Sequence, residues 1–123
     1  MIGKVCISIT PFFDLKTGKK SFKQRPVLVI GGLRNDDYTV LPISTVSVKK
    51  NLDPQYDKKV DPIIYPKLNL TKSCYVRTHK QTTIHKADLV KSIGDMKQDY
   101  EELYLEVLAL LEQFNSEVLT NAI

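Results

Sequence analysis

KQRPVLVI, residues 23–30, is the stretch from which the fold can be worked out. Its last four residues are apolar and mostly β-branched, which is typical of a buried β-strand. Pro26 stands directly before them, and proline is common at the first position of a strand. Arg25 then lies where the buried strand begins. A charged side chain that keeps a strand end in water is one explanation of Arg25. A functional site completed by other strands is the second.

Short apolar runs separated by turn residues surround this strand. Gly31 and Gly32 are expected to end it, and Pro42 interrupts the next run, which indicates a bulge or an edge position. The segments 10–24 and 47–62 are polar and lysine-rich, so we expect exposed loops there. The other expected strands cover residues 3–9, 38–45, 62–66 and 73–84. Many short strands with such turns are typical of a small antiparallel barrel or sandwich.

The C-terminal segment predicts a helix. In DMKQDYEELYLEVLALLEQFN, residues 95–115, apolar residues recur at helical spacing. Two capping boxes are candidates for its start, namely Asp95 with Gln98 and Asp99 with Glu102. Further apolar residues widen the stripe, so the helix either packs deeply against the sheet or also contacts a second copy of the chain. Residues 86–92 are expected to form a short helix before it.

The composition is that of one globular domain, residues 1–123, with 42% hydrophobic and 26% charged residues. No run approaches the roughly 20 apolar residues of a membrane span, and no leader peptide is recognisable. We therefore expect a cytoplasmic protein without membrane contact. A net charge of +4, with lysine-rich segments at 16–25, 49–59 and 72–86, favours a polyanionic partner. Cys6 and Cys74 are interpreted as small buried hydrophobes.

SCYVRTHKQ, residues 73–81, carries side chains suited to phosphodiester chemistry. If the run is a continuous strand, alternate residues share one face, and the polar face holds Tyr75, Arg77, His79 and Gln81. An arginine fork binds a phosphate and stabilises its developing charge. Histidine exchanges a proton near neutral pH. Ser44 and Thr45, at the end of another expected strand, add hydroxyl groups that can bond to phosphate oxygens. A polar face that meets only water is the alternative.

Three segments, QRPVLVI (24–30), LPIST (41–45) and QTTIHKADLVKSIGDM (81–96), resemble the MazF/PemK/Kid family of toxin–antitoxin toxins in order and spacing. The resemblance spans residues 2–114. It implies a small SH3-like antiparallel β-barrel with a C-terminal α-helix, assembled as a homodimer. It also implies a metal-independent endoribonuclease without a cofactor, which cuts single-stranded RNA to leave 2′,3′-cyclic phosphate and 5′-OH ends. A small cognate antitoxin would inhibit it.

The resemblance also assigns roles to residues. Arg25 matches the arginine that binds and polarises the scissile phosphate, and Ser44 matches an active-site threonine. Arg77 matches an arginine that acts as an acid and phosphate ligand, and His79 occupies the place of a catalytic carboxylate. The predicted catalytic residues are thus Arg25, Ser44, Arg77 and His79. The predicted RNA-binding residues are Thr45, Gln81, Lys20, Lys23 and Tyr75.

Several positions depart from the family pattern. Lys4 replaces an acidic residue, and no acid or histidine precedes Arg25 in KTGKKSFKQ, residues 16–24. Thr82 and His85 flank the TI pair, where many members have arginine and aspartate. These changes leave open which residue is the general base and which the general acid. Two other functions also stay open, an RNA-binding module without catalysis and a CcdB-like gyrase inhibitor. The absence of tryptophan and the ending LTNAI argue against the inhibitor.

Overall fold

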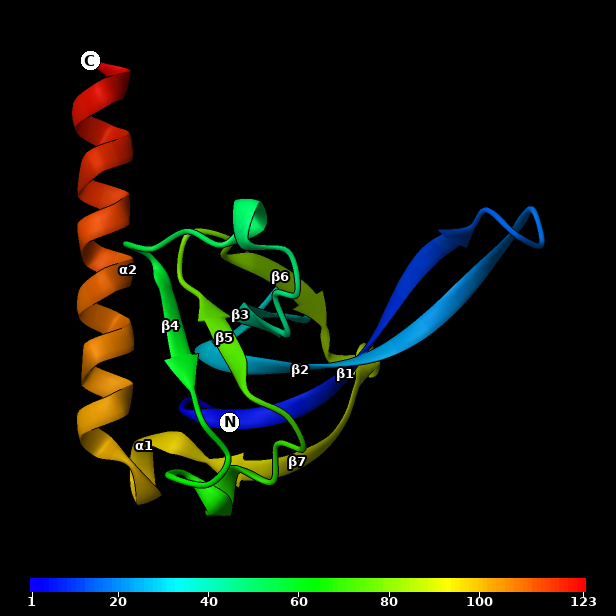
Figure 1. The fold of residues 1–123 in the computed structure, drawn as a ribbon, viewed down its shortest axis with the longest axis horizontal. Coiled ribbons are helices and arrows are strands. Elements are labelled where there is room, and N and C mark those ends of the chain that lie inside the picture. Colours follow the sequence, from blue (N-terminus) through cyan, green and yellow to red (C-terminus); the bar gives the residue numbers. More distant parts are fainter.

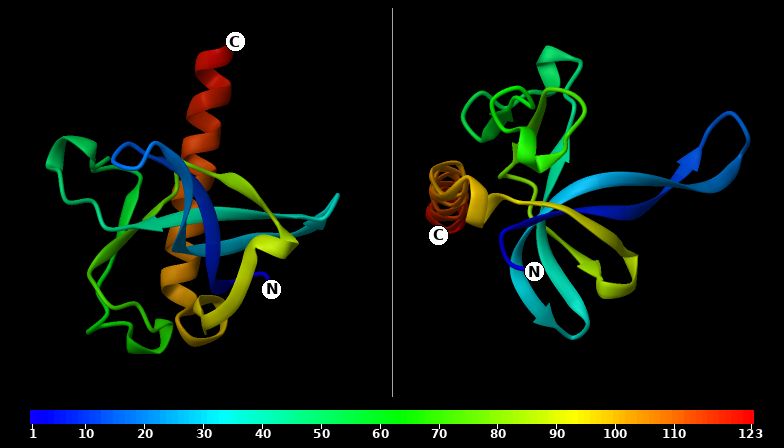
Figure 2. Two further views of the ribbon diagram at one scale, coloured as in Figure 1. Left: turned by 90° about the vertical axis from the view of Figure 1, so that its right-hand side faces the viewer. Right: turned by 90° about the horizontal axis from the view of Figure 1, so that it is seen from below.

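The strand that carries the apolar run 27–30 lies near the centre of a seven-stranded sheet in the computed structural model, which describes residues 1–123. It begins at Lys19, so Arg25 lies within the strand and not at its start, where it was expected. The strand order is β4-β5-β3-β2-β1-β7, and β6 also pairs with β3. The strands are β1 (Lys4–Asp14), β2 (Lys19–Arg34), β3 (Asp37–Ser44), β4 (Asp57–Val60), β5 (Cys74–Arg77), β6 (Thr82–His85) and β7 (Leu89–Asp95). The helices are α1 (Met96–Asp99) and α2 (Glu101–Ala122). All pairings are antiparallel, and the sheet curls with α2 along one side (Figures 1 and 2). A mainly β fold with a C-terminal helix was predicted, and it is confirmed.

The hairpin of β2 and β3 is longer than the sequence pattern predicts. Gly31 and Gly32 do not end the strand, because β2 continues to Arg34. At Gly31 a Cβ atom would lie 2.8 Å from the Cβ of Thr39, so the missing side chain lets the two strands approach. The turn is made by Asn35 and Asp36, both with positive φ, which suits a tight hairpin.

The expected loop at 10–24 is a second hairpin, and that prediction was wrong. β1 and β2 remain paired from Thr10↔Lys23 to Asp14↔Lys19. Their hairpin projects from the body of the sheet in Figure 1. The lysines suggested a loop, but backbone N–H and C=O groups form the hydrogen bonds of a strand pair whichever side chains the residues carry. The ammonium group of Lys23 also lies over the ring of Phe12, 4.8 Å from its centre.

The middle of the chain contains further differences. β4 lies inside the expected loop 47–62, whereas residues 62–66 form turns that leave Ile63 88% exposed. The expected strand 73–84 is divided into β5 and β6. The expected helix 86–92 is only a 3-10 turn at Lys86–Asp88, followed by β7. β4 and β7 form where a neighbouring strand, rather than local sequence, supplies the hydrogen-bond partners.

The position of Pro42 is explained by a change of partner along β3. Residues Asp37–Val40 pair with β6, whereas Ile43 and Ser44 pair with β5. On that side Pro42 faces no strand, so its missing N–H costs no ladder hydrogen bond there. The predicted edge position is thus present, but only locally, where β3 passes between two partners.

The main core lies between the curled sheet and the helices. Leu28, Leu41 and Val76 from the sheet belong to one buried cluster with Leu103 and Val107 of α2. This packing uses only one face of the helix, because Leu105 remains 54% exposed. The wide apolar stripe is therefore not fully covered, and contact with a second copy stays a prediction. Neither helix has the length and apolar character needed to cross a membrane.

The start of the helical region follows one of the two capping predictions. The Asp95 carboxylate accepts a hydrogen bond of 3.0 Å from the Gln98 N–H, which caps α1. Tyr100 then interrupts the helix with φ −140° and ψ 61°, and α2 begins after it without a side-chain cap. The predicted Asp99 cap is therefore wrong. The interruption turns α2 onto the core after one short helix.

The two cysteines are expected to be unreactive in the native protein. Cys6 and Cys74 are free and buried, and burial raises the pKa of the Cys74 thiol to about 11 and also raises the pKa of Cys6. Because the thiolate is the nucleophile, iodoacetamide at pH 8 should label neither residue until the protein is unfolded in urea. Mass spectrometry counts the labels. Native labelling at the rate of a free thiol would contradict this expectation.

Candidate active site

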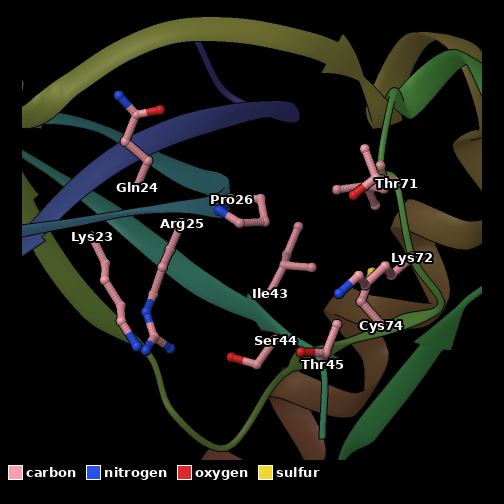
Figure 3. Close-up of a pocket in the computed structure, with 11 residues that line it drawn as sticks. Lys23, Gln24, Arg25, Pro26, Ile43, Ser44, Thr45, Thr71, Lys72 and Cys74 are labelled. Atoms are coloured by element: carbon pink, nitrogen blue, oxygen red, sulfur yellow. The ribbon is translucent and has the colours of Figure 1, made fainter.

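A basic pocket lies where β2 and β3 meet the segment that precedes β5 (Figure 3). It has a volume of about 360 Å³. Its polar side chains include three cations, three hydroxyl groups and no carboxylate, namely Lys23, Gln24, Arg25, Ser44, Thr45, Thr71 and Lys72. A pocket that offers cations and hydroxyl donors without competing acids suits an anion with several acceptor oxygens.

Arg25 is held at this pocket through its backbone. The fully buried hydroxyl of Ser8 donates a hydrogen bond of 3.0 Å to the Arg25 carbonyl, across the β1–β2 pairing. The guanidinium group of Arg25 remains exposed and free of ion pairs. Arg25 and Lys23 are two residues apart on one strand face, and Figure 3 shows their charged ends side by side, next to Ser44.

A second pocket of about 230 Å³ continues from the first. It shares Lys23, Arg25 and Ser44 with the first pocket and extends toward Phe12 and Thr82. This second pocket lies at the fork where β3 leaves β6 and joins β5. The two pockets together form a groove with Arg25 and Ser44 at their common boundary.

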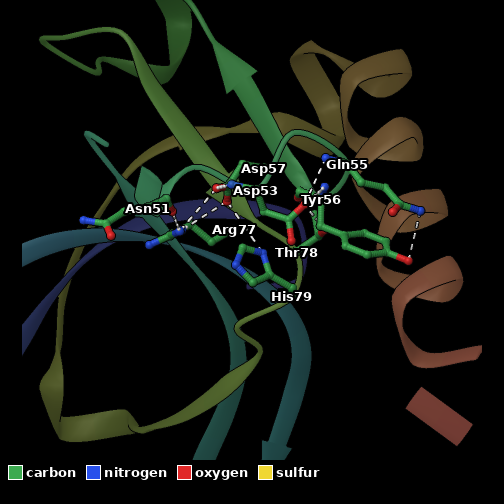
Figure 4. Close-up of polar contacts among 8 residues, drawn as sticks. All are labelled: Asn51, Asp53, Gln55, Tyr56, Asp57, Arg77, Thr78 and His79. Carbon is green, nitrogen blue, oxygen red and sulfur yellow. Dashed lines mark hydrogen bonds and ion pairs between the residues drawn. The ribbon is translucent and has the colours of Figure 1, made fainter. Parts of the chain in front are cut away.

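A separate polar cluster is formed around Asp57 on β4 (Figure 4). The carboxylate lies directly opposite Arg77 in the β4–β5 pairing, and the Arg77 Nε and Nη2 atoms donate to its two oxygens at 3.1 and 3.2 Å. Arg77 Nη2 also donates to the Asn51 carbonyl at 2.7 Å. The Asp57 side chain is fully buried, and that of Arg77 is 14% exposed. Arg77 is therefore a fixed positive charge rather than a mobile one.

His79 completes this cluster from the turn after β5. Its Nδ1 atom lies 3.7 Å from Asp57 Oδ1, and it is the only buried side-chain nitrogen or oxygen without a hydrogen bond. The ring packs edge-on against Phe114 of α2, with centres 6.2 Å apart. His79 and Arg77 line a third hollow together with Lys50 and Lys80. Helix α2 thus forms part of the wall around this histidine.

The comparisons with known proteins bear on the family and the fold. A family model described as PemK-like, MazF-like toxin of type II toxin-antitoxin system matches residues 7–114. The chain belongs to this toxin family. Among solved structures, the Mycobacterium tuberculosis toxin MazF-mt6 has a similar fold, with a TM-score of 0.55 and 23% identity over 89% of this chain and 96% of that chain. No curated protein matches the chain. The predicted family and its SH3-like barrel fold are confirmed.

The structure brings some of the predicted PemK/MazF site residues together and separates others. Arg25, Ser44, Thr45 and Lys23 line the basic pocket, whereas Arg77 and His79 line the third hollow. Three predicted RNA-binding residues line neither the basic pocket, nor the second pocket, nor the third hollow, namely Lys20, Gln81 and Tyr75.

The predicted row of four polar residues along one strand is wrong. β5 ends at Arg77, because Thr78 turns inward and its hydroxyl donates to the Tyr56 carbonyl at 2.6 Å. Gln81 therefore lies beyond a turn and is exposed. Tyr75 stays on β5, directly opposite Ser44.

Sequence reasoning missed three residues of these sites. Asp57 stood among lysines in a segment interpreted as a loop, so nothing marked it as a partner of Arg77. Had β4 been recognised, its antiparallel pairing with β5 would have indicated a carboxylate opposite that arginine. Lys72 and Thr71 lie in a connector, and only the folded chain brings them to Arg25.

Proposed function

We propose that the chain is an endoribonuclease toxin that cleaves single-stranded RNA. The observation that carries this proposal is the basic pocket, which is lined by Arg25, Ser44 and Thr45, three residues that the family resemblance predicts for the site. No acidic side chain is present in its lining to repel a phosphate. Membership of a type II toxin family supports an RNA substrate and a protein antitoxin as partners. It also supports the homodimer and the cytoplasmic location expected from the sequence.

The chemistry needs a held phosphate and a proton transfer. The Arg25 fork and the Ser44 hydroxyl would hold the scissile phosphate and stabilise the additional negative charge as it develops. The neighbouring 2′-OH of the RNA attacks phosphorus, the bond from phosphorus to the 5′-oxygen breaks, and a 2′,3′-cyclic phosphate results. The RNA supplies its own nucleophile. Cys74, which also lines the pocket, is a neutral thiol because its pKa is raised to about 11.

The Asp57 cluster would supply the proton transfer. Ser44 pairs with Tyr75, and Arg77 follows two residues later on the same strand, about 7 Å further along it. An RNA strand that crosses β3 and β5 would pass from the Arg25 pocket toward Arg77 and His79. We assign His79 as the group that exchanges the proton. Arg77, held by Asp57, would contribute a fixed positive charge, and Lys23 and Lys20 of the hairpin would contact flanking phosphates.

One experiment tests this function directly. Purified protein is incubated in EDTA with a single-stranded RNA of mixed sequence, and both ends of the products are mapped. We expect cuts at discrete sites with 5′-OH and 2′,3′-cyclic phosphate ends. A gel-shift assay run in parallel measures binding. Binding without any cleavage would replace the proposal by an RNA-binding module without catalysis.

A further inference from the structure

The Asp57 carboxylate has one acceptor position left, on the oxygen atom that lies near His79. An ionised carboxylate offers about four lone-pair positions. Three are used, because Oδ1 accepts from Arg77 Nε, and Oδ2 accepts from Arg77 Nη2 and from the Asp53 N–H at 2.8 Å. The remaining position is on Oδ1, 3.7 Å from the unpartnered Nδ1 of His79. A small rotation of the ring would convert this approach into a hydrogen bond.

We propose that Asp57 is a positioning residue that acts through His79, an inference that rests on the proposed ribonuclease function. Asp57 accepts a hydrogen bond from the Nδ1–H of His79, which leaves the lone pair on Nε2. The other nitrogen of a histidine decides which tautomer is present, so the carboxylate makes Nε2 the proton acceptor. Asp57 also stabilises the imidazolium that forms after proton transfer.

The proton balance of the step is simple. Nε2 of His79 takes the proton of the 2′-OH as the bond from the 2′-oxygen to phosphorus forms. The bond from phosphorus to the 5′-oxygen breaks, and this oxygen takes a proton from water. His79 then releases its own proton to water. The products are a 2′,3′-cyclic phosphate and a 5′-OH, and no further reactant is needed.

The surrounding contacts hold the backbone segments of the two residues beside each other. The residues directly before them are joined, because the Thr78 hydroxyl donates to the Tyr56 carbonyl at 2.6 Å. Helix α2 contacts His79 and also Tyr56, the residue directly before Asp57. The Phe114 ring packs against Tyr56 and His79, with centres 5.0 and 6.2 Å away, and the Tyr56 hydroxyl donates to Glu117. The pair therefore sits in a rigid setting, which a positioning role requires.

The ring nitrogens of the unmodified protein give the first test. The chain has two histidines, and His85 is an internal control, because its Nδ1 accepts a hydrogen bond of 3.1 Å from the Ala87 N–H. The neutral form of His85 must therefore carry its proton on Nε2. ¹⁵N shifts of the two rings should show the opposite tautomer for His79, with the proton on Nδ1. Finding Nε2–H in His79 as well would overturn the proposal.

A double-mutant cycle gives the second test, with RNA cleavage as the readout. Asp57→Asn should lower kcat by at least about tenfold, with KM nearly unchanged. In a His79→Gln background the same change should have no further effect, because Asp57 acts through that ring. Asp36→Asn is the matched control, since Asp36 lies in the exposed β2–β3 turn. An equal loss from Asp57→Asn in both backgrounds would mean that Asp57 acts through Arg77, and would overturn the proposal.

The two tests separate the inference from the function on which it rests. If the native protein does not cleave RNA, the proposed function fails, and the ¹⁵N measurement still decides whether Asp57 orients His79. If the protein cleaves RNA and His79 carries its proton on Nε2, only the inference fails. The ¹⁵N measurement needs no substitution, so a poorly folded variant does not affect it.

Discussion

Replacing Arg25 by alanine is expected to lower kcat/KM for RNA cleavage by about 10²- to 10³-fold, the usual cost of removing one preorganised donor to a developing negative charge. The fold should be unaffected, because the Arg25 side chain is exposed and only its backbone carbonyl is held, by Ser8. A fluorogenic single-stranded RNA measures the rate, and circular dichroism measures the thermal midpoint of the variant.

Two further variants make this expectation specific. Arg34→Ala removes the same charge from the far end of β2, where the side chain is exposed and lines none of the pockets. It should leave the rate nearly unchanged. Arg25→Lys keeps the charge without the two-pronged fork, so its rate should fall between those of the native protein and Arg25→Ala. Equal losses for Arg25→Ala and Arg34→Ala would show that only net charge matters.

Replacing Leu28 by alanine is expected to have the largest effect on stability. Leu28 is completely buried and pairs with Val5 on one side and Leu41 on the other. Removing such a side chain from a core costs about 2–5 kcal/mol in the free energy of unfolding. For a chain of this length the thermal midpoint should fall by about 10 °C or more. Urea titration followed by circular dichroism measures the loss.

The chain contains a matched control for this change. Leu15, in the turn of the β1–β2 hairpin, is 89% exposed, so Leu15→Ala should alter the free energy of unfolding by less than about 0.5 kcal/mol. A similar loss from both substitutions would mean that the core does not lie where β2 meets its two neighbouring strands.

The sequence indicated the fold correctly where local pattern and tertiary packing agree. Residues of the apolar run 27–30 and of the helically spaced segment after Tyr100 lie in the buried core. Both were predictable, because apolar residues recur along the sequence at the spacing that places them on the buried side of a strand or helix. It failed where a polar segment gains its order from a neighbouring strand. The lysine-rich residues 10–24 pair along their length, and Asp57–Val60 form β4 beside β5. Polar composition reports exposure, but it does not report whether the backbone is paired.

The candidate site was predictable to the extent that its members stand at the ends of apolar runs. Arg25 and Ser44 adjoin such runs and do meet in one pocket. Asp57 was not predictable, because a carboxylate among lysines acquires meaning only through the β4–β5 register. The position of His79 depends on the inward turn of Thr78, which no strand pattern indicates. Contacts made across turns are set by the folded chain as a whole.

The exchange of partners along β3 has a consequence for how the groove can change shape. The groove beside Arg25 opens where β6 is replaced by β5, and the connector that leads into β5 supplies Thr71 and Lys72 to its lining. Even a doubling of such a loop costs only about 0.6 kcal/mol in closure entropy. Insertions or deletions there would reshape the groove while the buried cluster around Leu28 stays intact. The fold thus allows the groove to diverge in shape among descendants without a new solution for the core.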